Sequence, residues 1–355
     1  MKILNTVVRQ ILALFILLAI VVSTGFAQQE NKKLAQTGMK FLNVGMSARQ
    51  ASLADAFTSV EAGSSSMFYN PSGMAKLGRL GEASFGQVNW IADIKHLYGA
   101  VALSPADGDY GVIGLSMQYV TYGEIEATVL ANNKQGFLDL GTFEPNALMF
   151  GLSYARALTN KFSIGATAKM VRQDLGTGII NANYTYAPDG TTPIGLADSG
   201  KVEAENKLNV VAFDFGLMYQ TGFKSLTLGM TIRNFAREVK YQKEGFQLPL
   251  TFKIGMSMNV LDLFEVDPKE QSLFVAVDAE HPRDYPEQLR IGMEYMFMKT
   301  VALRVGYVSP ADEYSICYGV GVQQSLSGVN FGIDYAYTPF GVFNNVQRIS
   351  LSFGF

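Results

Sequence analysis

The most constraining feature of the sequence is a strict alternation of large apolar residues with small or polar ones, which recurs in short segments from about Gly81 to the C-terminus. The segment NALMFGLSYARAL shows it well. One face carries Leu148, Phe150, Leu152 and Tyr154, and the other carries Met149, Gly151, Ser153 and Ala155. A period of two residues is that of a β-strand, because successive side chains of a strand point to opposite faces. A soluble β-sandwich would share this alternation, so it predicts strands without choosing between a sandwich and a barrel.

The connections between these segments choose between the two architectures. We count about fourteen segments, beginning near Glu82, Lys95, Tyr110, Ala147, Lys161, Leu208, Lys224, Pro249, Ser272, Gln288, Thr300, Ser315, Val329 and Val346. The even-numbered connections are tight, as in SPADGD, LTN, TGF, MKT and SLSG, with LFEVDPKEQ somewhat longer. The odd-numbered ones include the long stretches 122–146, 175–207 and 234–248. An even number of strands with short turns at one end and long loops at the other is typical of an outer-membrane barrel, with the turns in the periplasm.

Composition agrees with a transmembrane barrel. The chain is 48% hydrophobic, with 35 Gly, 24 Phe and 17 Tyr, yet residues 28–355 hold no apolar run long enough for a membrane helix. A net charge of −3 provides no basic surface for nucleic acid. The single cysteine, Cys317, can form no internal disulfide.

The N-terminal residues predict export. Lys2 and Arg9 precede the apolar run ILALFILLAIVV, and the small residues Gly25 and Ala27 suit cleavage after Ala27. We therefore predict a signal peptide over residues 1–27. The alternative is a membrane anchor, but the apolar run is shorter than the roughly 20 residues that a spanning helix needs.

Residues 28–80 do not have the pattern of a barrel wall. Over Ala48 to Val60 the apolar residues follow helical spacing, which predicts a helix. Asn70-Pro71 predicts its termination, because a residue before proline avoids the helical region, and Gly73 can close the turn that follows. We expect this segment to be a partly helical plug that fills the lumen of a barrel formed by residues 81–355.

The C-terminus has the alternation of a closing wall strand. In RISLSFGF, one face carries Ile349, Leu351, Phe353 and the terminal Phe355. A last strand that ends in Phe resembles the signal by which bacterial barrel proteins are recognised for membrane insertion. We place this row on the lipid-facing side.

The sequence offers little for catalysis or metal binding. Only His96 and His281 are present, too few for a His-rich metal site. His281 has Asp284 nearby, so a Ser-His-Asp site at the barrel rim is the alternative to an ordinary loop histidine. Gly319-Val320-Gly321 lies within a predicted strand and is followed by no helix, so it is not a dinucleotide loop. We expect no enzymatic activity, no cofactor and no metal.

Several charged residues lie on the face opposite the large apolar ones. An Arg or Lys facing lipid near the midplane costs about 2 to 4 kcal/mol, so these residues are assigned to the lumen. They are Asp214, Arg233, Lys253, Asp278, Arg290, Glu294, Arg304 and Asp334. Asp278, Arg290 and Arg304 lie on three successive strands and could form an ion-paired ladder. The charges serve either to satisfy one another and the plug, or to bind a ligand.

The stretch from Phe41 to Leu77, FLNVGMSARQASLADAFTSVEAGSSSMFYNPSGMAKL, resembles the start of the PorV/PorQ family, within the wider FadL-like group of outer-membrane proteins. The shared features are the Gly45 to Arg49 stretch, the apolar segment after it, and the motif Tyr69, Asn70, Pro71 and Gly73. The ending DYAYTPFGVFNNVQRISLSFGF resembles the C-terminus of that family. Ser72 departs from the usual Ala, and the Gln50 to Leu53 stretch replaces a Gly-rich run.

The resemblance implies a fourteen-stranded barrel in the outer membrane, with both termini in the periplasm. It also implies one of two functions. Members of the secretion branch serve the type IX secretion system, in which the expected partners are secretion-system proteins and exported substrates. FadL-like relatives instead pass hydrophobic small molecules through a gap in the wall. The lipid of the outer membrane is an expected partner in both cases.

Overall fold

The computed structural model describes residues 37–130, 134–180, 183–188, 193–197, 202–264, 266–311 and 313–355. The predicted signal peptide, residues 1–27, and the first residues of the predicted plug lie outside this part. Among the described residues, no helix has both the length and the apolar content needed to cross a membrane.

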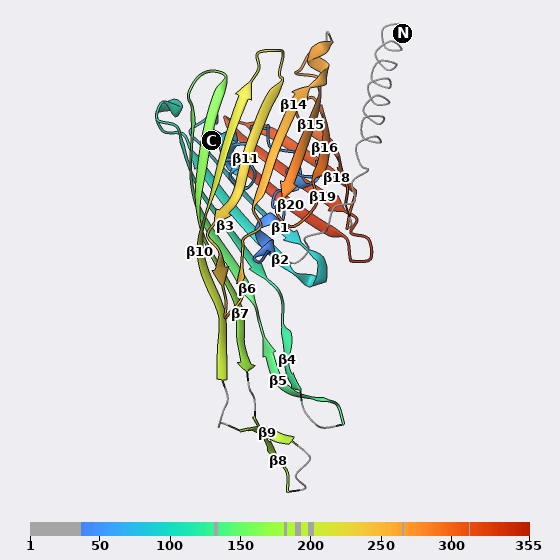
Figure 1. Ribbon diagram of the computed structural model, residues 1–355. Coiled ribbons are helices and arrows are strands. Elements are labelled where there is room, and N and C mark those ends of the chain that lie inside the picture. The colour runs from blue at the N-terminus through green and yellow to red at the C-terminus, as the bar shows by residue number, and fades with distance from the viewer. Residues whose placement is uncertain are drawn as a thin grey trace. The chain divides into compact units, whose positions relative to one another are not determined.

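Fourteen antiparallel strands form a closed barrel, as the sequence predicts (Figure 1). In barrel order they are β1 (Gly81–Asn89), β2 (Lys95–Leu103), β3 (Val112–Thr121), β6 (Asn146–Ala157), β7 (Phe162–Ile180), β10 (Val202–Gln220), β11 (Thr227–Ala236), β14 (Thr251–Asn259), β15 (Gln271–Pro282), β16 (Gln288–Phe297), β17 (Val301–Ser309), β18 (Ile316–Leu326), β19 (Val329–Thr338) and β20 (Val346–Gly354). Hydrogen bonds between β1 and β20 close the barrel. Four strands begin at the predicted residue, and most of the others begin within a few residues of it.

The alternation in the sequence becomes an inside and an outside of the wall. On β6, Leu152 is 58% exposed, whereas its neighbour Ser153 is 1% exposed. On β20, Ile349 and Leu351 point outward, while Arg348 and Ser350 are buried. The large apolar residues thus form the outer surface, which is the arrangement that a barrel in lipid requires.

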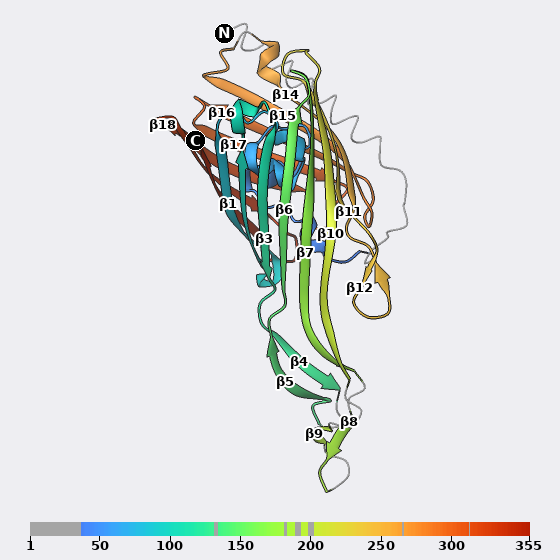
Figure 2. The same cartoon turned by 90° about the vertical axis from the view of Figure 1, so that its left-hand side faces the viewer.

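The connections differ between the two ends of the barrel. At one end they are short, and include the 3-10 turns η5 (Pro105–Gly108) and η6 (Val260–Leu263). At the other end, which holds η4 (Ile91–Asp93), three connections carry hairpins of their own: β4 (Ile125–Leu130) with β5 (Phe137–Phe143), β8 (Asn183–Tyr186) with β9 (Pro193–Ala197), and β12 (Val239–Lys240) with β13 (Gly245–Phe246). We call these the short-turn end and the long-loop end. The prediction of a loop over 175–207 is wrong in extent, because β7 and β10 keep pairing as far as Ile180 and Val202 (Figure 2).

Residues 37–80, the N-terminal segment, lie inside the barrel. The segment contains η1 (Lys40–Asn43), α2 (Ala48–Ala51), η2 (Gly63–Phe68) and η3 (Pro71–Met74). The predicted helix over Ala48 to Val60 is wrong beyond its first turn. Ala54 and Asp55 have positive φ values of 54° and 57°, and the Asp55 amide donates back to the Gln50 carbonyl, so the chain turns there. The apolar residues are nevertheless buried, with Leu53 and Phe57 at most 1% exposed.

Inward-facing glycines let the N-terminal segment approach the wall closely. A Cβ on Gly165 of β7 would lie 2.5 Å from the carbonyl carbon of Pro71, and one on Gly292 of β16 would lie 2.7 Å from Leu53 Cβ. Gly306 of β17 meets the backbone of Ala54 in the same way. Gly216, Gly229 and Gly319 make similar approaches from three further strands. These positions have no room for a side chain, so the wall and the segment are packed as one core.

Candidate functional site

The predicted Asn-Pro breaker is a helix cap. Asn70 has an extended backbone, with φ −139° and ψ 106°, and its side-chain oxygen accepts from the amide of Ser72 at 3.1 Å. Pro71 opens η3, and the Gly73 amide donates to the Asn70 carbonyl at 3.0 Å. The predicted turn is thus present, and Asn70 acts as an N-cap, which explains the residue type.

Asn70 also ties the segment to the wall. Its side-chain amide donates to the Thr58 carbonyl at 2.6 Å and to the Leu217 carbonyl of β10 at 3.2 Å. The adjacent Tyr69 is buried, with its ring 5.8 Å from that of Phe57 and the Arg233 guanidinium 5.9 Å from its centre. This motif therefore lies where the N-terminal segment meets β10 and β11.

A buried charge cluster joins the segment to the opposite side of the wall. Arg49 of α2 donates two hydrogen bonds to Glu294 of β16, at 2.9 and 2.7 Å. Arg304 of β17 donates to the same carboxylate at 2.5 Å and to Asp334 of β19 at 2.7 Å. Burial alone would lower the pKa of Arg49, but the charge of Glu294 raises it overall. Three of these four residues were assigned to the lumen from the sequence; Arg49 was not.

The predicted ladder of Asp278, Arg290 and Arg304 is wrong. Asp278 and Arg290 are register partners, but the Asp278 carboxylate accepts from the amides of Phe57 and Thr58, at 2.9 and 3.0 Å. Arg290 pairs instead with Glu280, whose carboxylate also lies 3.0 Å from Lys253 Nζ. The wall charges therefore bond to the N-terminal segment as much as to one another. Their partners in the segment depend on how the segment folds, which the spacing of residues in the sequence does not reveal.

A third buried cluster surrounds a bulge in β11. Arg233 and Asn234 both face inward there, opposite Asp214 of β10. The Asn234 amide donates to Asp214 at 2.8 Å, and Lys169 Nζ lies 2.5 Å from the same carboxylate. Lys169 and Glu280 were missed in the sequence, although both have the inward parity that identified the other lumen charges.

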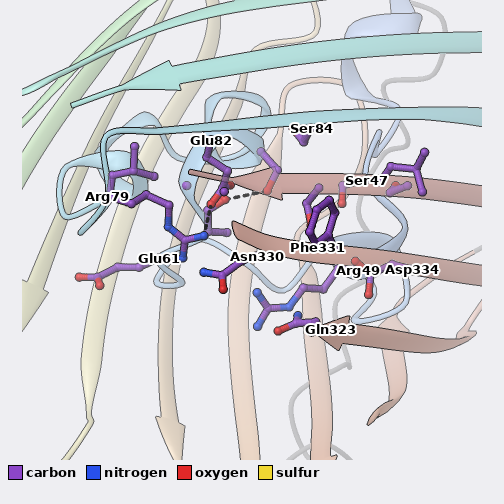
Figure 3. Close-up of a pocket in the computed structure, with 18 of the residues that line it drawn as sticks. Ser47, Arg49, Glu61, Arg79, Glu82, Ser84, Gln323, Asn330, Phe331 and Asp334 are labelled. Atoms are coloured by element: carbon purple, nitrogen blue, oxygen red, sulfur yellow. Dashed lines mark hydrogen bonds and ion pairs between the residues drawn. The ribbon is translucent and has the colours of Figure 1, made fainter. Parts of the chain in front are cut away.

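Two cavities flank the core of the N-terminal segment. The one at the short-turn end has a volume of about 500 Å³ and is lined mostly by polar groups. Figure 3 shows Arg79 directed at Glu82, with Arg49 and Asp334 further along the lining. The Arg79 and Glu82 charges lie 3.7 Å apart. Most of the other charged groups here already have partners in the N-terminal segment or the wall.

The cavity at the long-loop end has a volume of about 840 Å³ and a mixed lining with many aromatic side chains. Trp90, Tyr122, Tyr241, Tyr314 and Phe340 contribute to it, with Lys40, Arg290 and Arg348 among them. Burial raises the pKa of Tyr241 to about 12 and also raises that of Tyr314, so both phenols remain neutral at physiological pH. The acidic residues Asp55, Glu280 and Glu313 line the cavity as well, so it combines aromatic surface with charged groups of both signs.

The N-terminal segment begins at this same end. Thr37 forms a β-bridge with Gln247 in the connection between β11 and β14, and its hydroxyl donates to Asp284 at 2.6 Å. Lys40 pairs with Asp284 as well. The last residue, Phe355, bonds to Gly81 at the short-turn end. The first described residue therefore lies at the end opposite Phe355. The expectation that both termini are periplasmic concerns an N-terminus outside the described residues, and it stays a prediction.

The histidines are not assembled into a catalytic site. His281 Nδ1 lies 2.7 Å from Glu287 Oε1 in an exposed pair, and the nearby Asp284 is buried against Thr37 and Lys40. His96 is buried beside Trp90. Gly319 and Gly321 lie within β18, as expected. Among the described residues, no group of three or more His, Cys, Asp or Glu side chains is placed to hold a metal ion.

Solved structures with this fold are outer-membrane barrels. The Pseudomonas putida toluene transporter TodX is 11% identical, with a TM-score of 0.57 over 87% of this chain and 97% of that one. A Pseudomonas aeruginosa FadL homologue is 12% identical, with a TM-score of 0.50 over 87% and 97%. The CymD monoaromatic hydrocarbon channel is 11% identical, with a TM-score of 0.50 over 89% and 97%. At these identities the likeness shows a FadL-like barrel fold.

Comparison by sequence is more specific. No curated protein matches the chain. The family model described as type IX secretion system protein PorV matches residues 26–269. The match begins ahead of the N-terminal segment and runs to the connection between β14 and β15, so it includes the Asn70 motif. Because it spans more than half of the chain, this outer-membrane β-barrel belongs to the PorV family of type IX secretion system proteins.

Proposed function

We propose that this chain is a non-enzymatic accessory of protein export, which holds exported proteins or the translocon of a type IX secretion system at its long-loop end. The observation that carries the proposal is the packing of the lumen. The N-terminal segment fills the middle of the barrel, where Leu53, Phe57, Met67 and Met74 are at most 1% exposed. A barrel packed in this way is suited to binding at its surface more than to passage through its axis.

The long-loop end provides the structure that such binding needs. The β4–β5 and β8–β9 hairpins, and the part of the β7–β10 pair beyond the wall, extend from this end. On the β4–β5 hairpin, Ile125, Phe137 and Leu140 are at least 39% exposed. Exposed apolar residues on ordered hairpins favour a protein partner. We place this end outside the cell, as the sequence predicts for the long loops.

The experiment compares a strain that lacks the chain with strains that carry it or a variant without the β4–β5 hairpin. Residues 124–144 are replaced by a short Gly-Ser turn, which leaves every wall strand in place. We expect the surface display of exported proteins to be lost without the chain and strongly reduced with the variant. Unchanged display in the strain that lacks the chain would refute the proposal.

A second function is favoured by the aromatic cavity at the long-loop end. A pocket of about 840 Å³ with several aromatic side chains in its lining has room for a hydrophobic small molecule, and one structural neighbour is described as a toluene transporter. Passage to the membrane would need a gap in the wall; all fourteen neighbouring strand pairs are hydrogen-bonded, but the pairing of β10 with β11 stops at Ala212 while β10 continues to Val202. Uptake of toluene in the same three strains tests this alternative.

No catalytic step, metal or cofactor forms part of either function. The two histidines and Asp284 have structural partners, and the charged clusters bind the N-terminal segment. The partners we propose are exported proteins, other secretion proteins and the surrounding lipid.

A further inference from the structure

The outward face of the wall has a groove of about 830 Å³ over β6, β7, β10 and β11. Its lining is apolar over most of its length, with Phe150, Met170, Val211 and Phe235 each at least 51% exposed. Most of these residues are those that alternation assigns to the lipid side. The groove is therefore open to the membrane and separate from the cavities inside the barrel.

The groove exists because β11 leaves the wall early. The bulge at Arg233 and Asn234 breaks the register, and the pairing of β11 with β10 ends at Ala236 opposite Ala212. Strand β10 continues to Val202, paired only with β7 among the described strands. Gln242 covers one point of the free edge, where its amide donates to the Glu205 carbonyl at 3.1 Å. A bulge with increased twist followed by a missing strand leaves a step in the outer surface.

Two arginines lie at the long-loop end of the groove. Arg172 of β7 faces outward and lies directly across from Leu148 of β6 and Asn209 of β10. It is the next outward residue of β7 after Met170, toward the long-loop end. Arg237 follows the last residue of β11 and is exposed. No acidic side chain lines the groove in the described part of the chain. Arginine that faces hydrocarbon is strongly disfavoured, so these side chains mark the level of the lipid headgroups or require an anion.

Among the described residues, the charges around the arginines neutralise them only in part. Arg172 lies 4.0 Å from Asp174, but Lys207 lies closer to that carboxylate, at 3.5 Å. Arg237 has no ion pair or hydrogen bond with any described residue. The neighbouring Glu238 is turned toward Gly245, where an added Cβ would meet its carboxylate. Two arginines in the lining of one apolar groove suit a phosphate with an attached hydrocarbon chain.

We propose that this groove is a binding site for a membrane lipid whose phosphate gives it a net negative charge, unlike the zwitterionic phosphatidylcholine. Its phosphate is held between Arg172 and Arg237, and one acyl chain lies along Phe150, Val211 and Phe235. The site goes beyond the export function and does not depend on it, because it requires only that the barrel sits in a membrane. The lipid would occupy the step that the early departure of β11 leaves in the wall.

A tryptophan placed in the groove reports which lipid fills it. The chain has one Trp, Trp90, which lies inside the barrel, so Trp90→Phe removes the background and Phe235→Trp provides the probe. The protein is reconstituted into phosphatidylcholine vesicles that contain either brominated phosphatidylglycerol or brominated phosphatidylcholine. We expect the brominated phosphatidylglycerol to quench the probe at the lower mole fraction, with a preference of about fivefold for each arginine.

Variants then test the arginines. Arg172→Gln with Arg237→Gln should abolish the preference, whereas Arg156→Gln, an outward arginine near the short-turn end of β6, should preserve it. The heat-modifiable electrophoretic mobility of each variant confirms that it is folded. If the double variant does not fold, the two single variants are tested in its place, and each should reduce the preference. Equal quenching by the two lipids, or a preference that survives the double substitution, would overturn the proposal. Displacement of the brominated lipid by inorganic phosphate at constant ionic strength would also overturn it, since the site would then be one for a free anion.

Discussion

Glu294 of β16 and Arg304 of β17 lie directly opposite each other in the barrel ladder, and Arg49 of the N-terminal segment completes the pair from inside. The Glu294 side chain is 5% exposed and that of Arg304 is fully buried. One carboxylate thus serves a wall arginine and a segment arginine at once. This shared carboxylate makes the position of the segment depend on the wall.

Removal of that carboxylate should be costly. Glu294→Gln leaves Arg49 without a counter-charge and Arg304 with Asp334 as its one remaining acidic partner among the described residues, so we expect the free energy of unfolding to fall by about 3 to 5 kcal/mol. Urea unfolding of the barrel in lipid vesicles, followed by tryptophan fluorescence, measures this. The matched control is Glu61→Gln, whose side chain is 38% exposed and lies 3.8 Å from Lys76. It should change the free energy of unfolding by less than about 0.5 kcal/mol. A similar loss in both variants would mean that the buried cluster stabilises the barrel no more than an exposed ion pair does.

The glycines that face the lumen should not tolerate side chains. Gly306→Val would force a branched side chain against the backbone of Ala54, with an overpacking cost of about 1 to 3 kcal/mol or a displaced segment. Limited proteolysis of the folded protein distinguishes an overpacked segment that stays in place from a displaced one, because a displaced N-terminal segment becomes cleavable. For comparison, Gly178→Val places its Cβ 3.5 Å from Asn206 and away from the segment. Protection of the segment in both variants, with no loss of stability, would show that the close packing is not required.

Substitutions on the closing strand should depend on their face. Leu351 is 37% exposed on the outer wall, and Leu351→Arg should reduce the free energy of insertion and folding by about 2 to 4 kcal/mol near the midplane. Ser352→Arg points into the polar cavity at the short-turn end and should be tolerated far better. The yield of heat-modifiable barrel after folding into vesicles measures both. An equal yield from the two variants would contradict the assignment of the faces.

The strands were predictable because a lipid-facing wall imposes the alternation directly on the sequence. Lys95, Gln288, Val329 and Val346 begin strands where the pattern placed them. The inward parity of the charged residues was equally readable, because an outward charge is too costly. The bonding partner of each charge across the lumen was not readable from the sequence. Asp278, for example, accepts from the amides of Phe57 and Thr58, which reach it only in the folded N-terminal segment.

The failures lie where tertiary contacts override local preference. Helical spacing over Ala48 to Val60 gave way to a turn at Ala54 and Asp55, because Leu53 packs against Gly292 while the Ala54 carbonyl accepts from Arg290 at 3.0 Å. The bulge at Asn234 is fixed by Asp214 and Lys169, which are distant in sequence. The groove beside that bulge follows from the pairing of whole strands, which no single segment encodes.

A covalent lock between the N-terminal segment and the wall tests most directly whether the protein acts in export without opening its lumen. Ser64 Oγ and Ser84 Oγ of β1 lie 3.0 Å apart and are both buried. Ser64→Cys with Ser84→Cys, in a Cys317→Ser background, places two thiols at a distance suited to a disulfide. The measurement is the surface display of exported proteins in a strain that carries only this variant, once electrophoresis shows that the disulfide has formed. We predict display equal to that of the wild type with the disulfide intact; display that is lost in the oxidised variant and returns on reduction would contradict the proposal.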